Sequence, residues 1–209
     1  MKIRAILFDM DGVLVDAKEW HYEALNQALA LFGMEINRYD HLVTYDGLPT
    51  KKKLEMLSME RGLSKRLHGF INEMKQKFTL DYIHTKCAPL FCHEYALSRL
   101  KKEGYYIGVC SNSMRQTVSL IMAQSKLEPY LDLSLSNEDV IQGKPDPEIY
   151  IKAMAHLGVS PQECFIVEDN EKGIKAAKGS GAHVMVVSDV QEVNYFNIIS
   201  KIKEIEAKS

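Results

Sequence analysis

Features that mark secreted and membrane-spanning chains are scarce in this sequence. Its 209 residues include only four cysteines, whose irregular spacing shows no metal-type or redox-type pairing. No apolar run approaches the roughly 20 residues that a helix needs to cross a bilayer. The apolar run at residues 3–8 is too short for a signal peptide, and acidic residues follow it at once. We therefore expect a cytoplasmic protein in a reducing compartment.

The sequence also has almost no net charge. Its 26 basic and 28 acidic residues give a formal charge of −2, so no general attraction to nucleic acid or to an anionic membrane is expected. Apolar residues make up 46% of the chain and charged residues 26%, which is ordinary for a globular protein with a real core. This length suits one compact domain or a core domain with a modest insertion, and we expect a monomer.

Short apolar runs that end abruptly in polar residues predict the strands. The clearest runs are residues 3–8, 105–110 and 163–167, with a further run at 182–187 and a weaker one at 131–135. Nearly continuous apolar character is typical of strands that are buried on both faces. Helical patterns lie between and after them, at residues 114–125, 147–157, 171–180 and 193–207, and Ser113 is a plausible cap for the first. This alternation predicts an α/β fold, a Rossmann-like parallel sheet flanked by helices.

One long segment interrupts the alternation directly after the first strand. From Trp20 to Phe32 apolar residues recur at helical spacing and stop before Gly33. A second helical stretch ends at Gly62, and residues 67–82 suggest one or two more. No convincing strand occurs in this segment. The sequence therefore predicts an α/β core domain of residues 1–15 and 88–209, interrupted by an all-helical domain of residues 16–87.

Polar clusters follow three of the predicted strands. Ligands of open parallel sheets bind beyond the carboxyl ends of the strands, so these clusters should meet on one rim. The rim would carry Asp9, Asp11, Ser111, Asn112, Glu168 and Asp169. Converging carboxylates repel one another, and a hard divalent cation with oxygen ligands, such as Mg²⁺, relieves that repulsion. Lys144 can add a point charge for a phosphate.

These residue types suit phosphoryl transfer. An aspartate such as Asp9 can attack phosphorus and form an aspartyl-phosphate, which divides one hard displacement into two easier ones. Asp11 can protonate the leaving oxygen and then activate water. Ser111 and Asn112 can hydrogen-bond the phosphate oxygens. Taken alone, the two aspartates before Gly12 also suit a simple turn, and Ser113 suits a helix cap.

Four short motifs in a fixed order carry a resemblance to a known family. They are Asp9-Met10-Asp11-Gly12, Cys110-Ser111-Asn112-Ser113, Lys144-Pro145-Asp146-Pro147, and Val167-Glu168-Asp169-Asn170 with Gly173. Together they resemble the haloacid dehalogenase superfamily, in particular its phosphohydrolases of subfamily I with a small helical cap. The resemblance covers essentially the whole chain. Asp11, two positions after Asp9, resembles the aspartate that the phosphatase and phosphomutase branches have at this position. The dehalogenase branch lacks it, so the resemblance does not imply dehalogenation.

The resemblance also implies roles. Asp9 would be the nucleophile and Asp11 the general acid and base, while Ser111 and Lys144 would bind the transferring phosphate. Mg²⁺ would be held by the carboxylates of Asp9 and Asp169 and the backbone carbonyl of Asp11, with Glu168 supporting the metal site.

The helical domain is similar to the cap of the β-phosphoglucomutase-like branch. His21 and Lys75 look like cap positions near the substrate, and Gly47-Leu48-Pro49-Thr50 with Lys51 resembles the cap loop that faces the site. That group often has an arginine near this loop, where this chain has lysines. A lysine cannot form the two parallel hydrogen bonds with which an arginine binds a second phosphate, which favours a phosphatase over a phosphomutase. The sequence therefore predicts a magnesium-dependent phosphatase for a small phosphorylated metabolite, a sugar or polyol phosphate. A phosphomutase or a non-catalytic binding relative are the alternatives.

Overall fold

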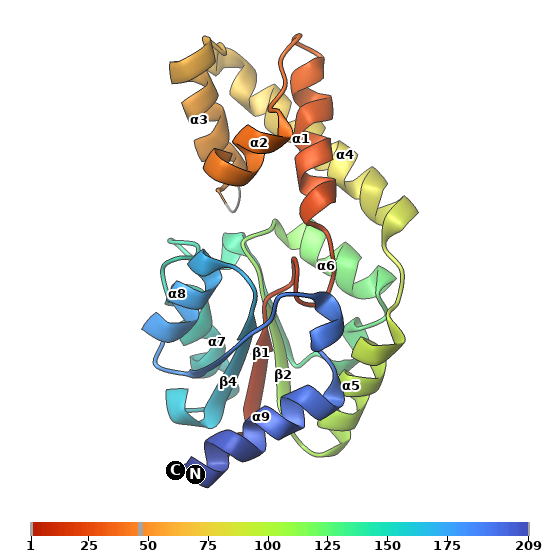
Figure 1. Ribbon diagram of the computed structural model, residues 1–209, viewed down its shortest axis with the longest axis vertical. Coiled ribbons are helices and arrows are strands. Elements are labelled where there is room, and N and C mark those ends of the chain that lie inside the picture. Colours follow the sequence, from red (N-terminus) through yellow and green to blue (C-terminus); the bar gives the residue numbers. More distant parts are fainter. Residues whose placement is uncertain (1, 46–47, 209) are drawn as a thin grey trace. The chain divides into compact units, whose positions relative to one another are not determined.

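The computed structural model describes residues 2–45 and 48–208, and the chain divides into two compact units (Figure 1). One unit joins the residues up to Asp16 with those from Cys87 onward, and the other contains residues 17–86. The first unit is built around a β-sheet. The second consists of helices and loops, and no strand occurs in its described residues, 17–45 and 48–86.

The sheet of the first unit has five parallel strands in the order β3-β2-β1-β4-β5. They are β1 (Ala5–Phe8), β2 (Tyr106–Cys110), β3 (Leu133–Leu135), β4 (Cys164–Glu168) and β5 (His183–Val186). Phe8 at the end of β1 lies opposite Val109 of β2 and Val167 of β4. The carboxyl ends of these three strands therefore finish almost level, which confirms the predicted parallel sheet.

Helices bury both faces of this sheet. They are α5 (Phe91–Lys102), α6 (Arg115–Gln124), α7 (Glu148–Leu157), α8 (Glu171–Gly179) and α9 (Tyr195–Lys208). Figure 1 shows α7 and α8 on one side of the strands and α5 and α9 on the other. Successive side chains of a strand point to opposite faces, so Ala5 and Leu7 pack with the cluster that includes Ile149 and Ala176. Every residue of β1 is fully buried, as its continuous apolar run predicts.

Short 3₁₀ turns complete the connections of this unit: η3 (Glu128–Tyr130), η4 (Asn137–Asp139), η5 (Pro161–Glu163) and η6 (Val190–Glu192). In this unit α6, α7, α8 and α9 begin and end within two residues of the predicted bounds, whereas the sequence does not predict α5. One local prediction is wrong. The N-cap residue of α6 is Met114 rather than Ser113, because the Ser113 hydroxyl donates to Asp11 Oδ2 instead, at 2.9 Å.

The helical unit contains α1 (Lys18–Ala30), α2 (Arg38–Asp40), the π-helical turn η1 (His41–Tyr45), α3 (Thr50–Arg61), η2 (Lys65–Leu67) and α4 (His68–Lys86). Its core includes Leu25 and Leu29 from α1, Leu54 and Leu57 from α3, and Ile71 from α4. The left-handed backbone of Gly62 ends α3, as its position in the sequence predicts.

A search of the described residues for a helix long and apolar enough to span a bilayer finds none.

Candidate functional site

The carboxyl ends of β1, β2 and β4 form a rim of buried polar side chains. Asp9 directly follows β1, Ser111 follows β2, and Glu168 is the last residue of β4. The backbone N–H of Asp9 donates to Val167 O at 3.0 Å, so the ladder fixes the start of the loop that follows β1. Asp9 is 5% exposed and Glu168 is fully buried. The parallel order with β1 at the centre thus brings together residues that are far apart in the sequence.

Lys144 links these acidic residues. Its ammonium group donates to Asp9 Oδ1 at 2.6 Å, to Glu168 Oε1 at 2.7 Å and to the Cys110 carbonyl at 2.8 Å. An ammonium group has three N–H bonds, and these three contacts account for all of them. The side chain of Lys144 is 3% exposed, so the ion pairs are shielded from solvent. This arrangement holds the predicted nucleophile beside a permanent positive charge.

Asn112 holds the backbone that carries this lysine. Its Oδ1 accepts the N–H of Lys144 at 2.9 Å and its Nδ2 donates to the Lys144 carbonyl at 3.1 Å. A side chain at Gly143 would begin 2.8 Å from the same Oδ1, so the preceding residue must be a glycine for this approach. The predicted phosphate contact of Asn112 stays a prediction, while the contacts present fix the position of Lys144.

Glu168 is held by partners on both carboxylate oxygens. Oε1 accepts the Tyr150 hydroxyl at 2.6 Å in addition to Lys144, and Oε2 accepts the backbone N–H of Asp169 at 3.1 Å. The Tyr150 ring lies under the lysine, with its centroid 4.7 Å from Nζ. A Cβ on Gly173 would fall 2.0 Å from Glu168 Oε1, so α8 can approach only because this residue is a glycine.

Tyr150 was not among the predicted site residues. Its position on the buried face of α7 is visible in the sequence, but an apolar helical pattern does not reveal that a buried hydroxyl meets a carboxylate. Burial, and then the negative charges of Glu168 and Asp9, raise the pKa of Tyr150 well above its usual value. Tyr150 therefore remains a hydroxyl donor.

The electrostatics of the rim favour an added cation. Burial raises the pKa of Asp9 well above its usual value; Lys144 opposes this rise, and Glu168 and Asp11 add to it. Burial alone would lower the pKa of Lys144, but Asp9 and Glu168 outweigh it and the pKa lies above its ordinary value. One lysine thus faces more than one carboxylate, and further positive charge would keep Asp9 ionised.

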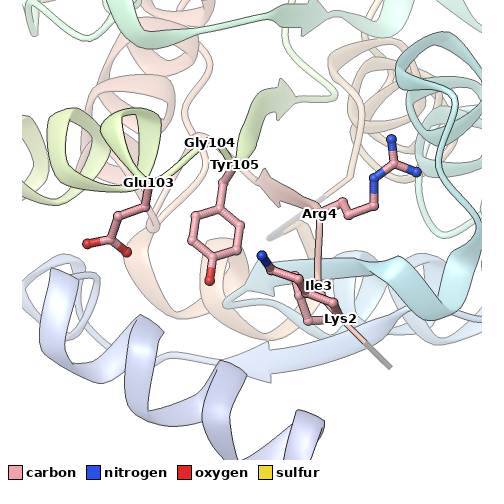
Figure 2. Close-up of a pocket in the computed structure, with 6 residues that line it drawn as sticks. All are labelled: Lys2, Ile3, Arg4, Glu103, Gly104 and Tyr105. Carbon is pink, nitrogen blue, oxygen red and sulfur yellow. The ribbon is translucent and has the colours of Figure 1, made fainter.

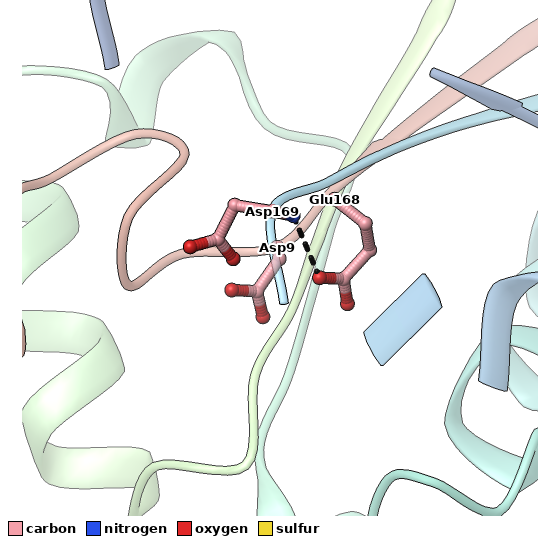
Figure 3. A group of neighbouring side chains, drawn as sticks. All are labelled: Asp9, Glu168 and Asp169. Carbon is pink, nitrogen blue, oxygen red and sulfur yellow. Dashed lines mark hydrogen bonds between the residues drawn. The ribbon is translucent and has the colours of Figure 1, made fainter. Parts of the chain in front are cut away.

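The acidic group has the donor set for such a cation. Asp9, Glu168 and Asp169 each offer a carboxylate oxygen, and these oxygens lie within 4.8 Å of one another (Figure 3). Oxygen-only ligands suit a hard ion such as Mg²⁺. Because Glu168 already serves Lys144, Tyr150 and the Asp169 N–H, the residues fit a site in which Asp9 and Asp169 are ligands and Glu168 supports them.

The loop after Asp9 turns sharply and presents Asp11. The carbonyl of Met10 accepts the N–H groups of Val13, Leu14 and Val15 at 3.3, 3.0 and 3.0 Å. Gly12, whose φ of +96° suits glycine, donates its N–H to Val15 O at 2.7 Å. The partly buried carboxylate of Asp11 accepts the Ser113 hydroxyl, and the N–H of Ser113 donates to Ser111 Oγ at 3.0 Å. Asp11 is therefore linked to the rim through the loop after β2.

The predicted cap residues lie in the helical unit. His21 of α1 and Lys75 of α4 contact each other, with 3.3 Å between Nδ1 and Nζ. Lys51 is exposed near the start of α3, and Gly47 of the predicted loop lies outside the described residues. The substrate-binding roles of His21, Lys75 and Lys51 stay predictions.

A hollow also occurs at the amino ends of the strands. It has a volume of about 460 Å³ and is lined by the segments 2–4 and 103–105, which precede β1 and β2 (Figure 2). The catalytic candidates follow the strands instead. The hollow therefore lies outside the rim.

Comparison with known proteins gives one family and many relatives. The model of the family described as "Haloacid dehalogenase-like hydrolase" matches residues 6–187. The chain is 27% identical over 197 residues to pyrophosphatase PpaX of Bacillus cereus (strain AH820), with 90% of this chain and 84% of that protein covered. It is 26% identical over 182 residues to a phosphorylated carbohydrates phosphatase of Thermotoga maritima, covering 86% and 82%.

Among solved structures, the β-phosphoglucomutase of Clostridium difficile shares the fold. The TM-score is 0.82 at 22% identity, over 98% of this chain and 99% of that one.

Proposed function

Because this chain belongs to the haloacid dehalogenase-like hydrolase family, we propose that it is a magnesium-dependent phosphatase of small phosphorylated metabolites that uses Asp9 as its nucleophile. The observation that carries the proposal is the buried Lys144 bridge, which joins Asp9 and Glu168 beside Asp169. Curated relatives of similar length are named as a pyrophosphatase and as a carbohydrate phosphatase. The substrate class is therefore a phosphate ester or anhydride.

Each residue has a task in the first half-reaction. A carboxylate oxygen of Asp9 attacks phosphorus, the bond to the leaving oxygen breaks, and Asp11 gives its proton to that oxygen. Lys144 holds Asp9 by a 2.6 Å hydrogen bond and favours its ionised form. The Ser111 hydroxyl accepts the Ser113 N–H, which leaves its own proton to donate to a phosphate oxygen.

The second half-reaction returns Asp9. Asp11, now ionised, takes a proton from water as the water oxygen attacks phosphorus, and the bond from phosphorus to Asp9 breaks. The products are inorganic phosphate and the regenerated carboxylate. Mg²⁺ bound by Asp9 and Asp169 would supply positive charge that offsets the negative charge of the phosphate oxygens.

The helical unit is proposed to serve as the cap that selects the substrate and excludes water, with His21, Lys75 and Lys51 as its contributing side chains.

A phosphomutase would use the same first half-reaction and return the phosphate to the sugar. Asp9, Asp11, Asp169 and Lys144 are all present at the rim, which favours a catalytic protein over a non-catalytic relative.

The test compares the wild-type protein with Asp9→Asn on a panel of sugar phosphates, polyol phosphates and inorganic pyrophosphate, with Mg²⁺ or with a chelator. We expect phosphate release only with Mg²⁺, and a loss of about 10³-fold or more in Asp9→Asn. Asp189→Asn makes the same chemical change at an exposed aspartate that caps η6, and asparagine caps as well, so its activity should be unchanged.

Two further measurements identify the chemistry. Borohydride treatment of acid-quenched enzyme reduces an aspartyl-phosphate to homoserine, which peptide mass analysis should place at position 9. Incubation with β-glucose 1-phosphate and a trace of the bisphosphate separates free phosphate from glucose 6-phosphate, the mutase product. Full activity in Asp9→Asn, or no phosphate release from any substrate, would refute the proposal.

A further inference from the structure

Ser113 connects two parts of the rim that the proposed chemistry treats separately. Its hydroxyl donates to Asp11 Oδ2 at 2.9 Å, across 102 positions of the sequence. Asp11 is the proposed acid and base, whereas Ser113 stands two residues after Ser111, the proposed phosphate ligand. The role predicted for Ser113 from the sequence is that of a helix cap, and it does not include this contact with Asp11.

The backbone of Ser113 is fixed from both sides. Its N–H donates to Ser111 Oγ at 3.0 Å, and its carbonyl accepts the N–H of Asn137, at the start of η4, at 3.1 Å. Helix α6 begins only at Arg115 and its N-cap residue is Met114, so Ser113 lies outside that helix. The hydroxyl that contacts Asp11 therefore belongs to a segment whose backbone is held by the residue after β2 and by the loop after β3.

The backbone of Asp11 is fixed as well, but its side chain is not fixed by that backbone. The turn closed by the Met10 carbonyl and the bridge between Asp11 and Val15 set the position of its Cα. The terminal torsion of an aspartate has a broad, roughly two-fold preference, so the direction of the carboxylate needs a partner. The Ser113 hydroxyl is a partner of that kind.

We propose that Ser113 is a positioning residue that fixes the Asp11 carboxylate for proton transfer to the leaving oxygen, an inference that rests on the proposed phosphatase function. A donor on Oδ2 places the acidic proton of Asp11 on Oδ1, because one oxygen does not readily carry both. As the bond from phosphorus to the leaving oxygen breaks, that proton moves from Oδ1 to the leaving oxygen, and Asp11 becomes a carboxylate. The hydroxyl of Ser113 keeps its own proton throughout.

This role has a signature that a purely structural role lacks. An alkoxide leaving group needs a proton as it departs, whereas p-nitrophenolate leaves readily without one. The value of kcat/KM reports the steps up to release of the leaving group, and therefore not the later attack of water. Loss of a positioned acid should thus lower kcat/KM for an alkyl phosphate and spare p-nitrophenyl phosphate.

The experiment measures both substrates in wild type, Ser113→Ala and Ser113→Thr, using the alkyl phosphate that wild type hydrolyses fastest. In Ser113→Ala the ratio of kcat/KM, alkyl over aryl, should fall roughly 10-fold, a part of what general acid catalysis contributes. Ser113→Thr keeps a hydroxyl and should restore most of the ratio. Ser98→Ala is the matched control, because it removes a hydroxyl that donates to the Tyr95 carbonyl within α5.

The outcomes separate this inference from the proposed function. An equal loss on both substrates, or an unchanged ratio in Ser113→Ala, overturns the positioning role while the phosphatase assignment stands. Absence of hydrolysis in wild type overturns both. A selective loss on the alkyl substrate that Ser113→Thr repairs supports the inference.

Discussion

One ion pair lies at the amino ends of strands β1 and β4 and another at their carboxyl ends, and the two pairs differ in their exposure to solvent. At the amino ends Arg4 bonds Glu163 at 3.2 Å, with side chains that are 46% and 27% exposed. At the carboxyl ends Lys144 bonds Asp9 at 2.6 Å, with side chains that are 3% and 7% exposed. The charges are alike, but at the buried pair burial raises the pKa of Asp9 well above its usual value, and Asp9 and Glu168 hold the pKa of Lys144 above its ordinary value. Burial, rather than charge alone, distinguishes a candidate reaction centre from a surface contact.

The largest expected effect follows from removing the buried cation. Lys144→Met leaves Asp9 and Glu168 buried without their shared partner, which should lower the free energy of unfolding by about 3–5 kcal/mol. Phosphate release should fall to background, because Asp9 loses the cation that holds it by a hydrogen bond and favours its ionised form. Urea unfolding followed by circular dichroism, together with phosphate release, measures both effects. Unchanged stability would mean that the ion pairs do not hold the rim together.

The carboxyl ends of the strands are also crowded where Glu168 meets Gly173, and Gly173→Ala tests that crowding. The added methyl group would meet the Glu168 carboxylate, so this carboxylate or α8 must shift. Overpacking of this kind costs about 1–3 kcal/mol, and displacement of a positioned group can lower kcat/KM by about 10²-fold.

Gly69→Ala is the matched control for that crowding. It adds the same methyl group in α4, where the new carbon meets nothing within 4 Å beyond its chain neighbours and the adjacent backbone of its own helix. It should stabilise the helix by up to about 1 kcal/mol and leave activity unchanged. A Gly173→Ala variant that behaves like Gly69→Ala in urea unfolding and in kcat/KM would show that the rim has room to spare.

The sequence predicts the strands and their rim well because each strand ends sharply. The apolar run of β1 stops at Asp9 and that of β4 at Glu168, and parallel pairing brings such ends together. The comparison with known proteins confirms the family and a hydrolase, and the sheet together with a solved structure of the same fold confirms the α/β fold. The site roles, the domain bounds, the monomeric state and the cytoplasmic location stay predictions.

Side-chain partners are where the sequence is silent. Residue type shows that Asn112 can bind a phosphate and that Ser113 can cap a helix. It does not show that Asn112 bonds the Lys144 backbone or that Ser113 donates to Asp11, because these contacts depend on the exact course of two distant loops. The sequence does not predict the contact of Tyr150 for the same reason, since the helical pattern predicts its burial but not its carboxylate partner.

The smallest effect is expected at the amino ends of the strands. Arg4→Met removes the cation of the exposed pair, but Glu163 keeps its other partners. The backbone N–H and the hydroxyl of Ser160, each 2.9 Å away, lower the pKa of Glu163 more than Arg4 does. The melting temperature and phosphate release should therefore match wild type at both low and high salt. A large loss in Arg4→Met would mean that the two ends of the strands do not differ as their burial indicates.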